Sequence, residues 1–292
     1  MMNIYSKLFQ DIYLSTNGYV PAWPIGTTFQ VGDIMLLQQH RMIPLGNLSD
    51  PYFGLDQYVE SYVREAPIER LWQVERGINV MHKASDMIHV LDGYLLLEGQ
   101  QAMIINFKER GDYFFRCKGI TYTHFKNFQE LEFEILQRLA SQKCCFKDIC
   151  VITDIATIDH YAMAIANKNK SCLIISGEDG SEYNLLDLAD PDSFYINKKI
   201  KDLDDLRLKW EGGNIFFKAR RMGLSSRGEH LITEYIHKYL PDALHRFESN
   251  ILDYATTDFL PSNVLYPANV HEYFNFRKMN LDDVEEFLGN VR

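Results

Sequence analysis

The sequence predicts an α+β protein: a mixed, mainly antiparallel twisted sheet flanked by helices and followed by a C-terminal helical tail. Apolar residues recur at helical spacing near both ends of the chain, whereas the middle contains β-rich runs separated by turn residues. The 292 residues are 46% apolar, which is enough for a sizeable core. Because the hydrophobic period changes along the chain, helices and strands are expected to pack together.

Charge and cysteine content narrow the class of protein. The formal net charge is -10, so nucleic acid is not an expected partner. Five cysteines without paired C-x-x-C spacing indicate a reducing compartment and neither a disulfide framework nor a structural metal site. The first ten residues lack the pattern of a signal peptide, and no apolar run reaches the ~18 residues of a membrane helix. We therefore expect the intact protein in the cytoplasm.

The N-terminal region predicts two helices and one strand. Apolar residues from Ile4 to Ile12 recur every four positions, which indicates a helix near residues 3–16, and Asn17-Gly18 is a typical C-terminal cap. Several prolines and glycines follow, so extended chain with a strand at 33–37 is expected. Helical spacing of apolar residues predicts a second helix over 78–91.

The central region predicts antiparallel strands. Glu109-Arg110-Gly111-Asp112 separates two strand-like runs, which is a hairpin signal, and a second antiparallel unit is expected around the turn at 167–170. The expected elements are strands at 101–108 and 113–122, a helix at 127–140, strands at 149–159, 160–166 and 172–176, and a strand at 214–219.

A linker is predicted after the last of these strands, because small residues interrupt two structured stretches there. It divides the chain into an α+β domain, residues 1–222, and a helical C-terminal segment, residues 223–292. Helices are expected at 229–240, 244–254 and 281–289, the last with Asn280 as N-cap. The linker supplies the candidate cleavage residues Gly223, Leu224, Ser225, Ser226 and Arg227.

No catalytic motif is recognisable: G-x-S-x-G, G-x-G-x-x-G, H-E-x-x-H and the Walker phosphate loop are all missing. Cys144 or Cys145 with His160 can in principle form a nucleophile and base, but structural thiols are the better interpretation. His230, Glu234 and His237 share one face of a predicted helix, where a solvated polar face is commoner than a metal site. We expect neither enzymatic activity nor a cofactor or metal.

Charge is segregated along the chain. Residues 198–227 include nine basic and four acidic residues, whereas residues 228–292 include eleven acidic and five basic residues. Ordinary patchiness is one interpretation; the other is that the acidic tail masks a surface for anionic lipid headgroups. The candidate lipid-facing residues are Lys198, Lys199, Lys201, Lys218, Arg220 and Arg221.

The order of elements from about residue 3 to 220 resembles the bacterial branch of the gasdermin family. The run Asn17-Gly18-Tyr19-Val20-Pro21-Ala22-Trp23-Pro24 is similar to the glycine, aromatic, valine and proline run after the first helix of those proteins. Lys83-Ala84-Ser85-Asp86 precedes the expected hairpin, and Cys150-Val151-Ile152-Thr153-Asp154-Ile155 resembles the family's valine and threonine strand. Trp210-Glu211-Gly212 and Phe216-Phe217-Lys218-Ala219 resemble its late strand.

The resemblance implies a domain kept soluble by its C-terminal segment. Proteolysis would remove that segment, and the hairpins would lengthen into membrane-spanning hairpins of an oligomeric pore that acts in cell death or antiviral defence. The implied partners are anionic membrane lipids, an activating protease and further copies of the chain. Two departures are that no cysteine lies near the N-terminus to carry a lipid and that the C-terminal part is longer than the usual bacterial inhibitory peptide.

Other classes of function stay open on the sequence. The main alternative is a soluble intracellular binding or adaptor protein without catalytic activity, whose helical tail is a second domain. An enzyme without the common motifs is a third class.

Overall fold

The computed structural model describes residues 4–22, 25, 27–38, 41–55, 60–65, 72–84, 89–91, 94–96, 101–140, 148–177, 185, 187–189, 197–239 and 270–288. The helices are α1 (Ser6–Ser15), α2 (Phe128–Ala140), α3 (Ser226–Tyr239), α5 (Val270–Tyr273) and α6 (Leu281–Phe287), with the 3-10 turn η2 (Asp187–Ala189). The strands are β1 (Val20–Pro21), β2 (Asp33–Gln38), β3 (Arg41–Asn47), β4 (Ser61–Glu65), β5 (Gln73–Arg76), β6 (Ile78–Ala84), β7 (His89–Leu91), β8 (Tyr94–Leu96), β9 (Gln101–Phe107), β10 (Tyr113–Phe125), β11 (Ile149–Ala166), β12 (Cys172–Gly177), β13 (Asn197–Lys201), β14 (Leu203–Leu224) and β15 (Phe274–Lys278).

The predicted α+β class with mainly antiparallel sheets is confirmed. The main sheet has nine described strands, with the order β1-β14-β11-β10-β4 along its central path. Strand β5 also pairs with β10, β2 with β11, β3 with β2, and β15 with β14. A second sheet has the order β13-β12-β9-β6, and β7 and β8 form a separate pair. All described pairings are antiparallel.

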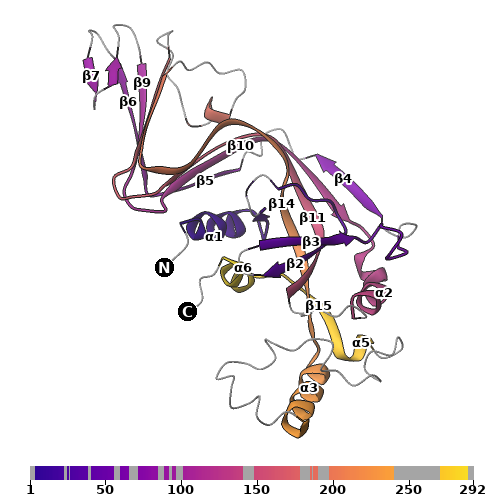
Figure 1. The fold of residues 1–292 in the computed structure, drawn as a ribbon. Coiled ribbons are helices and arrows are strands. Elements are labelled where there is room, and N and C mark those ends of the chain that lie inside the picture. Colours follow the sequence, from indigo (N-terminus) through magenta and orange to yellow (C-terminus); the bar gives the residue numbers. More distant parts are fainter. Residues whose placement is uncertain are drawn as a thin grey trace.

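Four chain segments run through both large sheets and bend where they pass from one to the other (Figure 1). Strand β5 continues into β6 through Gly77, β9 into β10 through residues 108–112, β11 into β12 through 167–171, and β13 into β14 through Asp202. The strand order β5-β10-β11-β14 in the main sheet repeats as β6-β9-β12-β13 in the second. The two sheets are therefore two long, bent β-hairpins lying side by side.

Three apolar clusters hold this arrangement together. One lies under α1 and contains Leu8, Phe9 and Ile12 with residues of β10, β11 and β14. Another joins α2 to β15. The third fills the corner between the two sheets. Burying a large apolar side chain contributes roughly 1.5–3 kcal/mol, so these clusters supply most of the packing energy.

Several predicted elements are wrong. The expected helix over 78–91 is replaced by β6 and β7, because residues 78–84 pair with β9. Runs 101–108 and 113–122 are strands but not a hairpin, since β9 and β10 belong to different sheets. The runs 149–159 and 160–166 form one strand, β11, and 172–176 pairs with β9 and β13 instead of β11.

The C-terminal segment differs from the predicted helical tail. Helix α3 and helix α6 occur close to where they were expected, and Asn280 caps α6 in a capping box with Asp283. The expected helix at 244–254 lies outside the described residues. Strand β15, which was not predicted, adds to the main sheet. In the part of the chain that the structure describes, no helix has the length and apolar character needed to cross a bilayer.

Candidate functional site

The C-terminal segment docks on the main sheet next to α1. Strand β15 pairs with the end of β14, from Arg220 opposite Lys278 to Leu224 opposite Phe274. Helix α6 then places Val284, which is fully buried, in the cluster under α1. The docked residues thus belong to the same core as the rest of the molecule.

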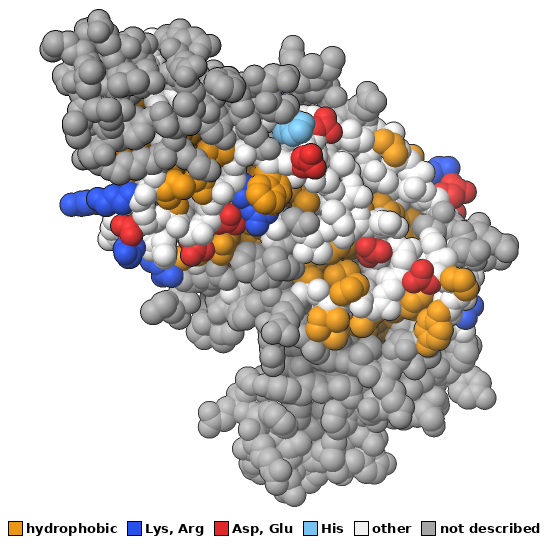
Figure 2. Space-filling view, turned by 45° about the horizontal axis from the view of Figure 1, so that its top comes forward, with side chains coloured by type: hydrophobic (Ala, Val, Ile, Leu, Met, Phe, Trp, Pro, Cys, Tyr) orange, Lys and Arg blue, Asp and Glu red, His pale blue; other side chains and the backbone are white. Residues whose placement is uncertain are grey.

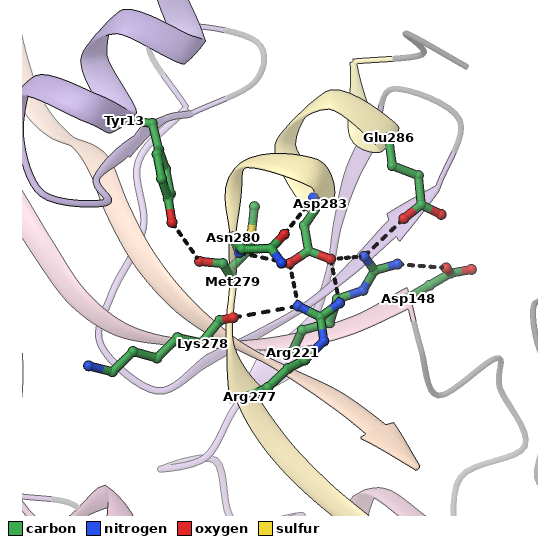
Figure 3. Close-up of polar contacts among 9 residues, drawn as sticks. All are labelled: Tyr13, Asp148, Arg221, Arg277, Lys278, Met279, Asn280, Asp283 and Glu286. Atoms are coloured by element: carbon green, nitrogen blue, oxygen red, sulfur yellow. Dashed lines mark hydrogen bonds and ion pairs between the residues drawn. The ribbon is translucent and has the colours of Figure 1, made fainter. Parts of the chain in front are cut away.

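A buried ion-pair network fixes this docking (Figure 3). Arg221 of β14 is 6% exposed; it donates hydrogen bonds from Nη1 to Asp283, which is 3% exposed, and to Glu286 Oε2 at 3.0 Å. Its Nη2 lies 3.8 Å from Asp148 Oδ1. Arg277 of β15 binds both oxygens of Asp283 at 2.5 Å. Bidentate contacts of this kind are geometrically specific, so they define how α6 sits on the sheet.

The environment of Asp283 favours its charged form. Burial alone would raise the pKa of this carboxyl group. Hydrogen bonds from Arg277 and from the Asn280 amide, together with the charge of Arg221, outweigh burial and hold the pKa of Asp283 below its usual value. The negative charge of Asp283 is therefore part of the docked state at neutral pH.

Helix α1 contacts the docked segment through polar and apolar groups. Gln10 donates to Glu285 Oε1 at 2.7 Å, and the Tyr13 hydroxyl donates to the Met279 carbonyl at 3.3 Å. Met279 and Val284 lie in the same buried cluster as the apolar face of α1. The position of α1 consequently depends on α6 and the residues before it.

The other polar groups of α1 reach the bends of the first hairpin. Lys7 Nζ donates to Asp112 Oδ1 at 2.8 Å, at the bend between β9 and β10. Asp11 accepts from Arg76, at the end of β5, and from the Tyr113 hydroxyl, at the start of β10, both at 2.7 Å. A single helix thus contacts both bent strands of this hairpin.

The second hairpin also has a fixed bend. The Tyr5 hydroxyl donates to Asp204 Oδ2 at 3.0 Å, near the start of β14. Asp202 has a positive φ of 54°, and its side chain accepts from Lys168 Nζ at 2.8 Å. Ser171 Oγ donates to the Asp202 carbonyl at 2.7 Å. These contacts join the two strands where both bend.

The turn η2 fills the corner between the sheets. Leu188 and Ala189 are fully buried and pack with Phe107 of the second sheet and Phe114 of the main sheet. Figure 1 shows the short helical turn between the two sheets. Apolar packing therefore restrains the bends in addition to their hydrogen bonds.

The predicted lipid-facing residues do not form one surface. Lys198, Lys199 and Lys201 belong to β13 in the second sheet, whereas Lys218, Arg220 and Arg221 belong to the far part of β14. About seventeen residues of extended chain separate Lys201 from Lys218, which is roughly 50 Å. Arg221 is buried in the ion-pair network. On the face drawn in Figure 2, the described Lys and Arg side chains lie in small groups among acidic and apolar ones.

The predicted cleavage residues do not form a linker. Gly223 and Leu224 are the last residues of β14 and pair with β15, and Ser226 begins α3. The Ser225 amide donates to the Tyr273 carbonyl at 2.8 Å. Arg227 is exposed but pairs with Glu272 at 2.5 Å. Small residues occur here because the chain passes from strand to helix against the docked segment: a Cβ at Gly228 would lie 2.2 Å from the Tyr273 carbonyl oxygen.

The other sequence candidates carry no reactive arrangement among the described residues. His230, Glu234 and His237 are exposed on α3, and His230 lies 3.7 Å from Glu234. Cys144 and Cys145 lie outside the described residues. Cys117 and Cys150 are buried free thiols, and burial raises the pKa of each to about 12, which disfavours the thiolate. No group of three or more described His, Cys, Asp or Glu side chains is close enough to hold a metal ion.

A cavity of about 630 Å³ lies beside the docked segment. It is bounded by the end of α1, the start of α2, β11, β14 and β15. Its charged lining residues are Lys126, Glu130, Asp154, Lys218, Arg220 and Lys278. The sequence singled out Lys218 and Arg220 but missed Lys278, because β15 was not predicted.

Comparison with known proteins gives no further guide. No protein-family model matches the chain, and a search of curated proteins found no match. The resemblance to gasdermins therefore stays a prediction from short sequence motifs.

Proposed function

We propose that this protein is an autoinhibited pore-forming protein whose C-terminal segment is removed by proteolysis before it oligomerises in a membrane. The observation that carries the proposal is the pair of bent hairpins. Four neighbouring segments pass through two sheets in the same order and bend at matching positions. Straightening the bends would join the two sheets into one four-stranded sheet without changing any strand neighbour.

The lengths of these segments fit a bilayer. A spanning strand needs roughly 9–11 residues. Even the shortest of the four, from Gln73 to Ala84, has strands of 4 and 7 residues on either side of Gly77. The first hairpin ends in the β7–β8 pair, where Val90, Leu91, Leu95 and Leu96 make the sequence apolar. Backbone groups of the spanning strands would be satisfied when neighbouring copies close into a ring.

The contacts of α1 supply a restraint that can be released. Helix α6 packs on α1, and groups at the bends are bound by Lys7 and Asp11 of α1 and by Tyr5, its N-cap residue. Removing α6 would uncover part of the apolar cluster under α1 and weaken the hold of α1 on the bends. Proteolytic removal of α6 would therefore reach the bends through α1. Cell death or antiviral defence is the setting that the gasdermin resemblance implies.

Dye release from vesicles tests the proposal. A protease site is inserted between α3 and α5, and the intact and cut proteins are added to vesicles that contain anionic lipid. We expect release only after cutting, and faster release from the cut Arg277→Ala variant, whose segment is held less tightly. A cut protein that stays monomeric and releases no dye, even with Arg277→Ala, would contradict pore formation and favour a binding or adaptor protein.

A further inference from the structure

Three basic side chains meet on one face of the sheet at the cavity beside the docked segment. Lys218 and Arg220 are two residues apart on β14, so they point to the same side. Lys278 of β15 is the cross-strand partner of Arg220. Like charges directly opposite each other destabilise an antiparallel pair. This arrangement therefore weakens the pairing of β15 with β14 unless an anion offsets it.

Asp154 is the cross-strand neighbour of Lys218, but its carboxylate is engaged by other groups. Asp154 lies 2.5 Å from His124 Nδ1 and accepts from the Thr153 hydroxyl at 2.7 Å. The other lining acid is Glu130, and the fourth lining cation, Lys126, pairs with Glu60 at 2.8 Å. Among the residues that the structure describes, Lys218, Arg220 and Lys278 have no ion-pair partner within 4 Å.

Lys218 is partly buried beside an aromatic ring and between charges of both signs. Its ammonium group lies 4.4 Å from the centre of the Tyr19 ring. Burial lowers the pKa of Lys218; the charge of Asp154 partly opposes this effect, and the charge of Lys278 adds a smaller lowering. Arg220 lies over the Phe128 ring at 5.0 Å. Each cation thus has an aromatic or cationic neighbour at the cavity.

We infer that this cavity binds a small phosphate monoester, which bridges Arg220 of β14 and Lys278 of β15. Arginine and lysine are the side chains that proteins use for phosphate, and about 630 Å³ accommodates such a ligand. Because Lys278 belongs to the docked segment, a ligand bound here stabilises the docked state by linkage. The phosphate can belong to a soluble monoester or to a lipid headgroup. The inference does not depend on pore formation.

Thermal unfolding of the intact chain tests this site. Glycerol 3-phosphate and inorganic phosphate are compared with sodium chloride at matched ionic strength, and cosedimentation with phosphatidylcholine vesicles, with and without phosphatidate, tests the headgroup as the source. We expect the midpoint to rise saturably with glycerol 3-phosphate but not with chloride. Phosphatidate-dependent cosedimentation without a response to soluble phosphate would instead assign the phosphate to a headgroup.

Two variants make the result specific. Lys278→Gln removes the like-charge pair, so without ligand it should unfold at the same temperature as wild type or higher, while its affinity for the phosphate falls about tenfold or more. Lys201→Gln, at an exposed position of β13, should bind like wild type. No response to any phosphate source, or an equal response in Lys278→Gln, would overturn the site. Neither outcome involves dye release, so neither bears on the proposed pore function.

Discussion

Asp283 is the residue on which the docking network converges, since it accepts hydrogen bonds from two arginines and from the Asn280 amide. Removing one partner of a buried ion pair leaves the other charge uncompensated, which costs roughly 3–5 kcal/mol. We expect Asp283→Asn to lower the free energy of unfolding by about 3 kcal/mol in urea titrations at pH 7. Asp282→Asn, at the exposed neighbouring position, is the matched control and should change it by less than about 0.5 kcal/mol.

The same variant has a pH signature with a defined sign. The pKa of Asp283 is lower in the folded than in the unfolded chain, so its contribution is present above the unfolded pKa of about 3.9 and is lost as the pH falls through the folded value. The stability difference between wild type and Asp283→Asn should therefore shrink below about pH 4. A difference that stays constant down to pH 2 would mean that packing, and not charge, makes Asp283 important.

Gly77 shows how one residue maintains a bend. Its φ is 65°, and a Cβ there would lie 1.9 Å from Asp112 Oδ2. That carboxylate is buried and held by Lys7 and by the Glu109 amide, so an added methyl group must displace it and break these bonds. Gly18 also has a positive φ, of 96°, but its nearest neighbour would be 3.7 Å away.

We expect Gly77→Ala to destabilise the fold by roughly 1–3 kcal/mol more than Gly18→Ala, because only the first combines backbone strain with lost hydrogen bonds. Thermal denaturation followed by circular dichroism measures both variants. Equal losses would show that the Lys7–Asp112 contact does not hold the bend.

Among the elements, η2 is packed in the corner between the two sheets. Leu188 is fully buried against both, and a buried Leu→Ala change costs roughly 2–5 kcal/mol. In Leu188→Ala we expect faster amide exchange in β9 and β12 than in the main-sheet strands β10 and β11. Leu14→Ala, at a position that is 66% exposed, should leave the exchange pattern unchanged. Uniform acceleration in both sheets would instead mean that they unfold as one unit.

The elements that the sequence predicted well are those whose pattern reflects local structure. Helices α1 and α2 have a clear apolar face, and Asn280 with Asp283 is a local capping signal. The prediction for residues 78–84 was wrong because these residues also fit a helical period. Their structure is decided by pairing with β9, a strand that is distant in sequence. Phe274 and Phe276, both buried on alternate positions, were a usable strand signal for β15.

The bends were beyond prediction because a turn sequence does not reveal how far the chain turns. Residues 108–112 contain a glycine and charged residues, as hairpin loops do, yet here they pass the chain from one sheet to another. The prediction of the lipid-facing basic residues was wrong for the same reason. Basic residues that are near each other in sequence are divided between β13 and the far part of β14, whereas Lys278 joins Arg220 only through the pairing of two distant strands.

At the scale of the whole molecule, the C-terminal segment is linked to the bends by contacts that run through α1. Val284 and Val270 are both fully buried in this segment, but in different places: Val284 of α6 packs in the cluster under α1, and Val270 of α5 packs in the cluster with α2. The two residues provide the same change of volume at two distinct contacts, and only one of them touches the cluster that includes α1.

We expect Val284→Ala and Val270→Ala to cost similar free energies of unfolding, roughly 2 kcal/mol each, because both remove the same buried surface. Their effects on amide exchange should differ. Val284→Ala should accelerate exchange in α6, in α1 and at the bends 108–112 and 202–204, since Lys7 of α1 and Tyr5, its N-cap, contact the bent strands there. Val270→Ala should act on α5 and α2 and leave the bends protected. If exchange at the bends responds equally to both variants, or to neither, α1 does not transmit the docking of α6, and the segment would have to restrain the hairpins by another route.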